Sequence, residues 1–285
     1  MGVDIAISQK MAHAIYKWGK MYTNEAPWLN EEVKSLNLPA SICSEMARLV
    51  TMEAEIDISG STRANLISQS LKKFLANIQV YTEYACSAGG IVFKPYPLEG
   101  GIAVDVVKAG DFFPVAFDSA GNISAAIFPE FKRVGKKLYT RLEYQSYENG
   151  HYIIENRAFV SRRALVRTDE IINLGQEISL EDVTEWSDIE PSVELENADR
   201  TLFSYFKIPL ANNTDTSSPL GVSVFARAVD QIRDADEQYG ATLWEYKSKE
   251  TAIQAADEFF RKNRKGEVIL PKGKARLYRP MGPGI

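Results

Sequence analysis

Apolar residues recur at helical spacing in the first third of the chain. A period of three to four residues is typical of an amphipathic helix. One such face follows Leu38–Pro39, and a second begins near Ser61–Thr62. The second helix is expected to end at Gly89–Gly90, because glycine commonly follows the last residue of a helix. The first face consists of Ile42, Met46, Leu49 and Val50, and the second of Leu66, Leu71, Leu75, Ile78 and Tyr81.

Three aromatic residues lie before these helices, around Pro27. They are Trp18, Tyr22 and Trp28. We expect them to anchor an irregular start of the chain to its core, since large aromatic side chains bury more surface than other residues. An exposed binding patch is the alternative interpretation.

From residue 91 the apolar period changes to two, which predicts β-strands. Glycine pairs and polar turns separate the strands, and Asn149–Gly150 supplies the positive φ angles that a tight hairpin needs. Residues 91–160 are therefore predicted to form a mainly antiparallel meander. An acidic, loop-rich connection around Trp186 leads to one more strand. The predicted strands are 91–93, 102–106, 112–117, 123–131, 137–147, 151–160 and 202–208.

A long striped helix is predicted from Pro219 to about Tyr246. Ser218 is a suitable N-cap, and proline is tolerated at the first helical position. At about 1.5 Å per residue this helix would be roughly 40 Å long. A stripe of this length indicates contact with copies of the chain or with a partner, and a single buried core helix is the alternative. The stripe consists of Val222, Phe225, Val229, Ile232, Tyr239, Leu243 and Tyr246.

Asp236 interrupts the stripe. One polar residue on an apolar line often fixes register or assembly state, and a position facing a wet channel is the other interpretation. The register hypothesis predicts that Asp236→Leu alters assembly more than folding. Asp234 and Glu237 fit a solvated helical face.

The order of these elements predicts the α+β class. We expect a helical block over residues 1–90, mainly antiparallel β structure over 91–210, one long helix and a small final region. With 285 residues, the chain can hold one large domain or two smaller ones.

Composition adds two expectations. No apolar run reaches the length of a membrane span and the first twenty residues carry charges throughout, so we expect no membrane association. Cys43 and Cys86 have no evident pairing logic and are expected to be reduced core residues of an intracellular protein.

Charge is distributed unevenly. Residues 261–285 hold eight basic residues and one acid, which gives this end a net charge of +7. Since the whole chain carries −5, the other 260 residues carry −12. This basic end suits nucleic acid or an acidic partner, and a solvated loop is the plain alternative. Its candidate basic surface consists of Lys262, Arg264, Lys265, Lys272, Lys274, Arg276 and Arg279.

No motif predicts catalysis. The chain has no phosphate-binding loop and no dinucleotide fingerprint. His13 and His151 lie far apart, and no metal-ligand spacing occurs. We therefore expect no catalytic, cofactor or metal site. The alternatives are a small soluble hydrolase with paired carboxylates and a binding module whose basic end contacts nucleic acid. The acidic residues considered for the hydrolase were Glu143, Glu155, Asp234 and Asp236.

Taken together, several segments resemble the N-terminal part of portal proteins of tailed bacteriophages, the type found in siphophages of Gram-positive hosts. They follow the order expected for the family and cover most of the chain. The segments are LPASICSEMARLV at 38–50, GGIVFKPY at 89–96, YTRLEY at 139–144, FSYFK at 203–207, SPLGVSVFARA at 218–228, LPKG at 270–273 and RLYR at 276–279.

The resemblance implies a homo-oligomeric ring, usually of twelve subunits, at one capsid vertex of the virion, assembled in the host cytoplasm. Such a ring passes double-stranded DNA without sequence specificity during packaging and ejection. It binds terminase, scaffold and head-completion proteins. The resemblance also implies a wing over residues 1–215, a stem helix over 216–250 and the beginning of a clip over 251–285.

Family members continue beyond the length of this chain, so we expect the second stem helix and the crown to be missing. Two physical features agree with the resemblance. A long helix can present different faces to two neighbours in a ring. An acidic balance avoids gripping DNA, because each neutralised phosphate adds affinity.

Overall fold

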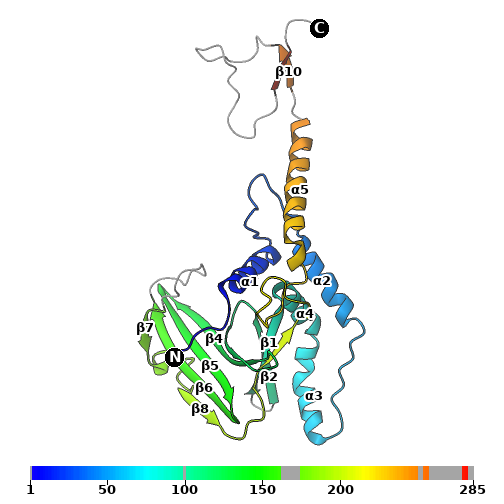
Figure 1. The fold of residues 1–285 in the computed structure, drawn as a ribbon. Helices are drawn as coiled ribbons and strands as arrows, with labels where there is room; N and C mark the ends of the chain where they lie inside the picture. Colours follow the sequence, from blue (N-terminus) through cyan, green and yellow to red (C-terminus); the bar gives the residue numbers. More distant parts are fainter. Residues whose placement is uncertain (1, 99–100, 162–173, 250–252, 257–277, 282–285) are drawn as a thin grey trace. The chain divides into compact units, whose positions relative to one another are not determined.

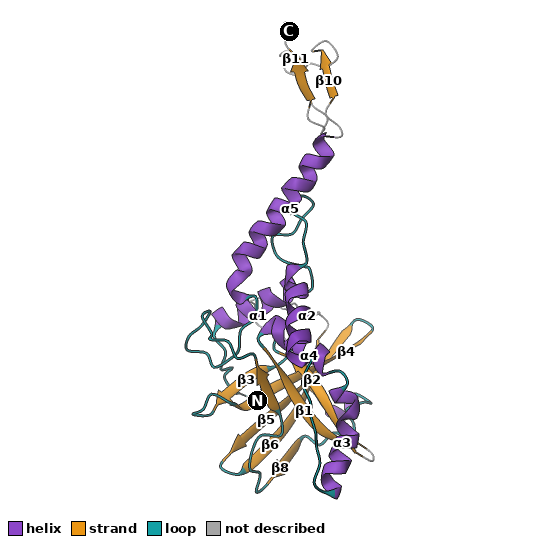
Figure 2. Ribbon diagram, turned by 90° about the vertical axis from the view of Figure 1, so that its right-hand side faces the viewer, coloured by secondary structure: helices purple, strands orange, loops and turns teal. Residues whose placement is uncertain are grey.

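The computed structural model describes residues 2–98, 101–161, 174–249, 253–256 and 278–281. The chain divides into two compact units. Unit 1 comprises Met1–Ala26 and Pro39–Arg227, and unit 2 comprises Pro27–Leu38 and Ala228–Ile285. Helices and antiparallel sheets occur together, which confirms the α+β class (Figures 1 and 2). The division falls after Arg227 rather than at the predicted boundary after residue 215, and a segment of the predicted wing belongs to unit 2.

The helices of unit 1 begin and end at recognisable signals. They are α1 (Gln9–Tyr22), α2 (Leu38–Thr51, in unit 1 from Pro39), α3 (Thr62–Leu75) and α4 (Ile78–Ala88). Ser8 and Ser61 cap α1 and α3, since their side chains accept hydrogen bonds from backbone N–H groups of the first turn. Gly89 ends α4 in the left-handed region with φ 89°, as predicted. The single helix predicted over this region is wrong, because Ala76–Asn77 separates α3 from α4.

The predicted aromatic anchors of the N-terminal region are confirmed. Trp18 is buried in α1, and Tyr22 Oη donates a hydrogen bond of 2.8 Å to Glu83 Oε1 of α4. A fully buried aromatic side chain of this size contributes about 1.5–3 kcal/mol or more to folding. Trp28 belongs to unit 2 and is described below.

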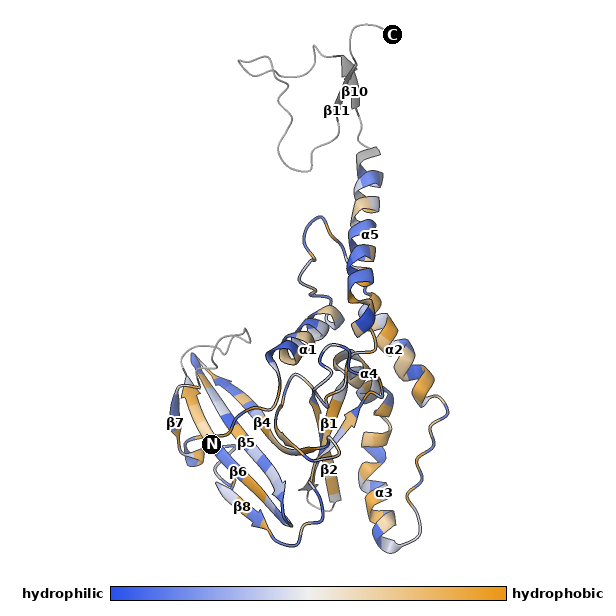
Figure 3. Ribbon diagram, viewed as in Figure 1, coloured by the Kyte–Doolittle hydropathy of each residue, from blue (hydrophilic) through white to orange (hydrophobic). Residues whose placement is uncertain are grey.

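Helix α2 turns its predicted apolar face to solvent and buries another side. The residues it buries are Pro39, Cys43 and Ala47. The face turned to solvent consists of Ile42, Met46, Leu49 and Val50, with exposures from 37% to 57%. Helical periodicity identified the apolar side of α2 correctly, but small residues fill the contact with the rest of unit 1. Figure 3 shows apolar colouring along α2.

A three-stranded sheet lies next to α3 and α4 (Figure 1). Its order is β2 (Gly101–Lys108), β1 (Gly90–Leu98) and β9 (Ser204–Lys207), all antiparallel. β1 and β2 are longer than the predicted strands 91–93 and 102–106, and β9 is shorter than the predicted strand 202–208. Phe93 of β1 packs between Phe74 of α3 and Phe206 of β9.

A six-stranded antiparallel sheet forms the rest of unit 1. The predicted turn at Asn149–Gly150 is confirmed, with φ of 51° and 87°. Two short strands were not predicted, because the acidic connection has no clear alternation. The path runs through β3 (Phe113–Phe117), β4 (Ile123–Val134), β5 (Lys137–Glu148), β6 (His151–Ser161) and β7 (Gln176–Ile178), and β8 (Ser192–Leu195) also pairs with β6.

The connection around Trp186 has a core of its own. Trp186 is 1% exposed and packs with Ala158, Leu180 and Val183. The short 3₁₀ helix η1 (Leu180–Asp182) has a capping box with Ser179. Burial of these apolar side chains holds the connection against the six-stranded sheet.

Unit 2 contains one long helix, α5 (Val229–Lys249), and a parallel pair of short strands, β10 (Ile253–Ala256) and β11 (Tyr278–Met281). Helix α5 has 21 residues and is therefore about 30 Å long. The predicted start at Pro219 is wrong, since residues 219–225 are not helical and a 3₁₀ turn, η2 (Ala226–Ala228), precedes α5. In the part of the chain that is described, no helix is both long and apolar enough to cross a membrane.

Candidate functional site

Residues 27–38, hereafter the strap, run along helix α5 within unit 2. Trp28 Nε1 donates a hydrogen bond of 2.9 Å to Asp236 Oδ2, and the backbone N–H of Leu36 donates one of 2.8 Å to Asp236 Oδ1. Asp236 is 2% exposed. Gly240 lies one turn further along, where a Cβ atom would overlap the carbonyl oxygen of Glu32. The strap is thus fixed to one face of α5.

The position of Asp236 corrects its predicted role. Both carboxylate oxygens serve donors of the same chain, so Asp236 is not part of the surface that a neighbouring copy would contact. A buried carboxylate needs hydrogen-bond donors to offset its lost hydration. The interruption of the apolar stripe is explained by the strap, because Trp28 and Leu36 supply those donors.

The other residues of the predicted stripe separate into three groups. Val222 and Phe225 are both 1% exposed, but they precede α5 and are buried in unit 1, so their assignment to the helix is wrong. Ile232 of α5 is buried, and Val229 and Leu243 are half-buried. Tyr239 and Tyr246 of α5 are exposed, at 37% and 69%, and so is Trp244, at 55%, which was not part of the predicted stripe.

The exposed aromatic residues lie on two sides of α5. Tyr239 and Tyr246 are seven residues apart and share one side, since 3.6 residues make a turn. Trp244 lies about 160° around the helix from Tyr246 by the same geometry. The heptad pattern did not identify Trp244, because it falls off the stripe. By helix geometry Trp244 lies about 80° around α5 from Asp236, beside the stripe rather than opposite it.

The Ser-Pro-Leu-Gly segment has a role different from helix initiation. Ser223 Oγ donates a hydrogen bond of 3.1 Å to the carbonyl oxygen of Cys86, and Val224 N donates one of 3.0 Å to the same oxygen. This carbonyl belongs to the last turn of α4, where helix geometry leaves acceptors unpaired. The segment after Gly221 therefore caps α4 within unit 1.

A close backbone contact fixes the same segment. A Cβ atom on Gly89 would overlap the backbone of Gly221, and one on Gly221 would overlap the carbonyl oxygen of Gly89. Gly221 N also donates a hydrogen bond of 3.2 Å to Tyr205 Oη, whose pKa burial raises to about 12. The glycines at 89 and 221 are thus required by packing.

The acidic residues considered for a hydrolase do not form a catalytic pair. Glu143 of β5 is buried, and its carboxylate accepts hydrogen bonds of 3.0 and 3.2 Å from Lys94 Nζ. Its cross-strand partner on β6 is Asn156, so Glu155 points to the other face of the sheet. Asp234 is exposed on α5. Glycoside-hydrolase chemistry needs two carboxyl groups on either side of one bond, and these four acids do not provide it.

Lys94 and Glu143 belong to a wider polar cluster between the two sheets. Arg141 contacts Glu143, at 3.2 Å, and Glu130, at 2.6 Å. Trp186 Nε1 donates to the second oxygen of Glu130, at 3.2 Å. Burial works to raise the pKa of Glu130, but the bonds from Arg141 and Trp186 outweigh it, so this pKa lies below its usual range. Two cations meet two carboxylates, which leaves the cluster neutral and structural in character.

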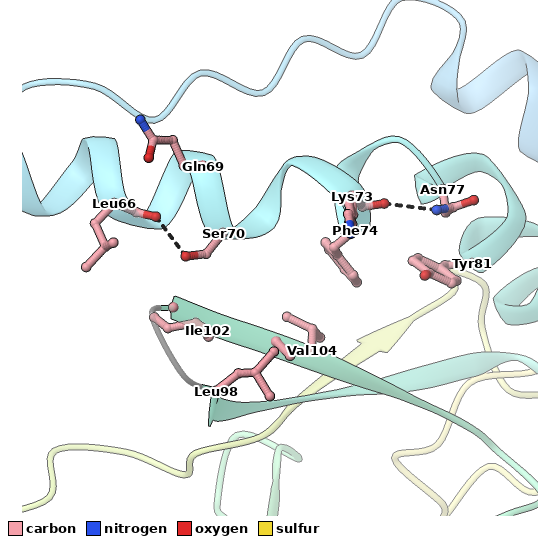
Figure 4. Close-up of a pocket in the computed structure, with 12 residues that line it drawn as sticks. Leu66, Gln69, Ser70, Lys73, Phe74, Asn77, Tyr81, Leu98, Ile102 and Val104 are labelled. Carbon is pink, nitrogen blue, oxygen red and sulfur yellow. Dashed lines mark hydrogen bonds between the residues drawn. The ribbon is translucent and has the colours of Figure 1, made fainter.

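A cleft of about 500 Å³ lies between α3 and the β1–β2 hairpin (Figure 4). Leu66, Phe74, Leu98 and other apolar residues line it. The hydroxyl of Ser70 donates to the carbonyl oxygen of Leu66, and the amide of Asn77 donates to that of Lys73. The side chains of Ser70 and Asn77 therefore bond to the backbone of α3 rather than converge on the cleft.

Lys262, Arg264, Lys265, Lys272, Lys274 and Arg276 lie outside the described residues, and Arg279 is described only as backbone in β11. His151 is exposed after the β5–β6 turn and pairs with Glu194 at 2.7 Å. Among the described residues, no group of His, Cys, Asp and Glu could hold a metal ion.

The two cysteines confirm their predicted place in the core. Cys43 and Cys86 are buried and free. Burial raises the pKa of both thiols, that of Cys86 to about 11, so they remain protonated at neutral pH.

Comparison of the sequence with protein-family models and with curated proteins found no match. The function is therefore inferred from the geometry above and from the sequence resemblance.

Proposed function

We propose that this chain is a subunit of a phage portal, a ring at one capsid vertex through which double-stranded DNA passes. On this proposal unit 1 is the wing, α5 is a stem helix, and the protein has no catalytic activity of its own. Terminase, scaffold and head-completion proteins would dock on the assembled ring.

The observation that carries the proposal is the exposed aromatic surface of α5. Tyr239 and Tyr246 lie on one side of the helix and Trp244 on another. Large apolar side chains in exposed rows typically mark an interaction surface. Two such sides on one helix suit a head-to-tail ring, in which each subunit uses different surfaces toward its two neighbours.

Two further features support the proposal. Of the acids considered for catalysis, Glu143 is neutralised in the polar cluster and Asp236 is bound to the strap. Glu155 is half-buried on β6, and Asp234 is exposed on α5. Residues 1–260 also carry a net charge of −12. A channel with this balance would add little affinity for the phosphates of passing DNA.

Native mass spectrometry and negative-stain electron microscopy of the full chain test the proposal. We expect closed rings for the wild type. The double variant Trp244→Ala, Tyr246→Ala should shift the population to monomers, because it removes an aromatic contact toward each neighbour. Interface aromatic residues commonly cost 2 kcal/mol or more on truncation, which is about a 30-fold loss in affinity per contact.

The matched control is Gln238→Ala, an exposed position of the same helix on the side away from the strap. It should assemble as the wild type does. If the double variant forms rings as the wild type does, α5 is not part of the contact between subunits. A wild-type chain that stays monomeric at the highest attainable concentration would refute ring assembly by this chain.

A further inference from the structure

Residues 42–57 expose an unusually apolar surface on unit 1. Along α2 and the segment after it, six large apolar side chains are 37% to 62% exposed. We call this surface the apolar face. Monomeric proteins rarely expose so many large apolar residues in one place. The apolar face consists of Ile42, Met46, Leu49, Val50, Met52 and Ile56.

Three acids border the apolar face. Glu53, Glu55 and Asp57 are exposed. Within the described residues no cation pairs with them, and the only bond to their side chains is from Ser59 Oγ to Asp57, at 2.7 Å. We call them the acidic rim. A partner for this surface therefore combines apolar residues with positive charge.

The same unit carries a surface with those properties at the end of the β4–β5 hairpin. Phe131 and Val134 are 48% and 53% exposed. Arg133, Lys136 and Lys137 are exposed beside them, and none pairs with an acid among the described residues. We call these five residues the basic tip.

The hairpin presents the basic tip on a firm support. β4 and β5 pair continuously from Ala125↔Ser146 to Val134↔Lys137, next to the turn. Figure 1 places this end of the hairpin and α2 on opposite sides of unit 1. The basic tip and the apolar face of one copy therefore lie on separate parts of unit 1.

We propose that the basic tip of one copy docks on the apolar face and acidic rim of the next. The occupant is a second copy of this chain, because one surface supplies positive charge with apolar residues and the other supplies the complement. Different surfaces meet in this contact, so it is head-to-tail and repeats from copy to copy. The inference rests on the proposed function, to which it adds a wing-to-wing contact that does not involve α5.

A charge-swap experiment on the full chain tests this contact. The tip variant is Lys136→Glu, Lys137→Glu, and the rim variant is Glu53→Lys, Glu55→Lys. Each variant alone brings like charges together, which should weaken assembly at least about tenfold in midpoint concentration. Mixed in equal amounts, the two variants should assemble again, since the acidic tip of one fits the basic rim of the other.

The control Lys72→Glu, Arg157→Glu makes the same change in charge as the tip variant, at exposed positions outside both surfaces. It should assemble as the wild type does, and circular dichroism checks that every variant is folded. Mass photometry across a salt series gives the readout. Assembly through the tip and rim should weaken as salt rises, because ions screen exposed charges.

The outcomes separate this contact from the proposed function. Wild-type rings that neither charge variant weakens overturn the contact and leave the portal proposal standing. Recovery in the mixture supports the contact. Open head-to-tail chains that respond to charge but never close would support the contact and count against a ring. A strictly monomeric wild type overturns both.

Discussion

The indole of Trp28 and the carboxylate of Asp236 are 208 residues apart in sequence and 2.9 Å apart in space. Their hydrogen bond joins the strap to α5 within unit 2. Asp236 also accepts a bond from the Leu36 backbone, so one side chain holds two points of the strap. Asp236, a polar residue on an apolar helical stripe, therefore binds a segment of its own chain.

Asp236→Leu should destabilise unit 2 and release the strap. Two part-buried donors would lose their acceptor, and each should cost less than a fully buried unsatisfied group, which costs about 1–3 kcal/mol. Hydrogen exchange at the Leu36 amide and the fluorescence of Trp28 give the readouts. Asp234→Leu on the exposed side of α5 is the control and should leave Leu36 protected. An unaltered exchange rate in Asp236→Leu, together with changed assembly, would restore the register hypothesis.

Gly221→Ala should destabilise unit 1. The new methyl group would overlap the carbonyl oxygen of Gly89, and this backbone has little room to move because Gly89 O also accepts a bond from Ile208 N. Overpacking of this kind costs about 1–3 kcal/mol. Urea denaturation measures the loss.

Gly19→Ala is the matched control for that substitution. Its Cβ atom would meet nothing within 4 Å, and the residue lies inside α1. Alanine is favoured over glycine in a helix by about 0.5–1 kcal/mol, so this variant should be as stable as the wild type or more so. Equal stability of Gly221→Ala and the wild type would show that the Gly89–Gly221 contact can relax.

Local patterns predicted most of unit 1. The change of period at residue 91, the helix start near Ser61–Thr62 and Asn149–Gly150 as a hairpin turn were each confirmed. These signals act within a few residues, which is why the sequence alone carries them. The strap was not predictable, because its bonds to Asp236 join segments about two hundred residues apart.

The errors have a common physical cause. Ser218 and Pro219 suit a helix start, yet the segment that follows them contacts α4 instead, because Cys86 offers an unpaired carbonyl and Gly89 a close approach. The periodicity of α2 likewise could not show that Cys43 and Ala47, rather than Ile42 and Met46, face the core. Tertiary contacts decided both cases.

Unit 1 should lose stability in acid partly through Glu130. Its pKa in the folded state is lower than the ordinary value of 4.5, through Arg141 and Trp186 and against the effect of burial. The contribution of Glu130 to the stability of unit 1 is therefore fully present when the pH is above the ordinary pKa. This contribution is lost as the pH falls through the lower pKa of the folded state. The side chain is half-exposed, so the effect is small. The midpoint of urea denaturation should be measured from pH 6 down to pH values below the ordinary carboxyl range. As the pH falls, this midpoint should decrease less steeply in Glu130→Gln than in the wild type. Identical pH profiles would exclude this role.

Lys94 connects the two sheets of unit 1, because it extends from β1 to the carboxylate of Glu143 on β5. Lys94→Met keeps an apolar stem over the ring of Phe128 but leaves Glu143 with fewer donors. We expect a loss of about 1–3 kcal/mol in the free energy of unfolding, since a buried charge loses one of its partners. Adding Glu143→Gln should recover part of that loss, because the unpaired charge is then gone. Urea denaturation of the two single variants and the double variant measures the coupling as a double-mutant cycle. Purely additive losses would mean that Lys94 and Glu143 stabilise the sheets independently.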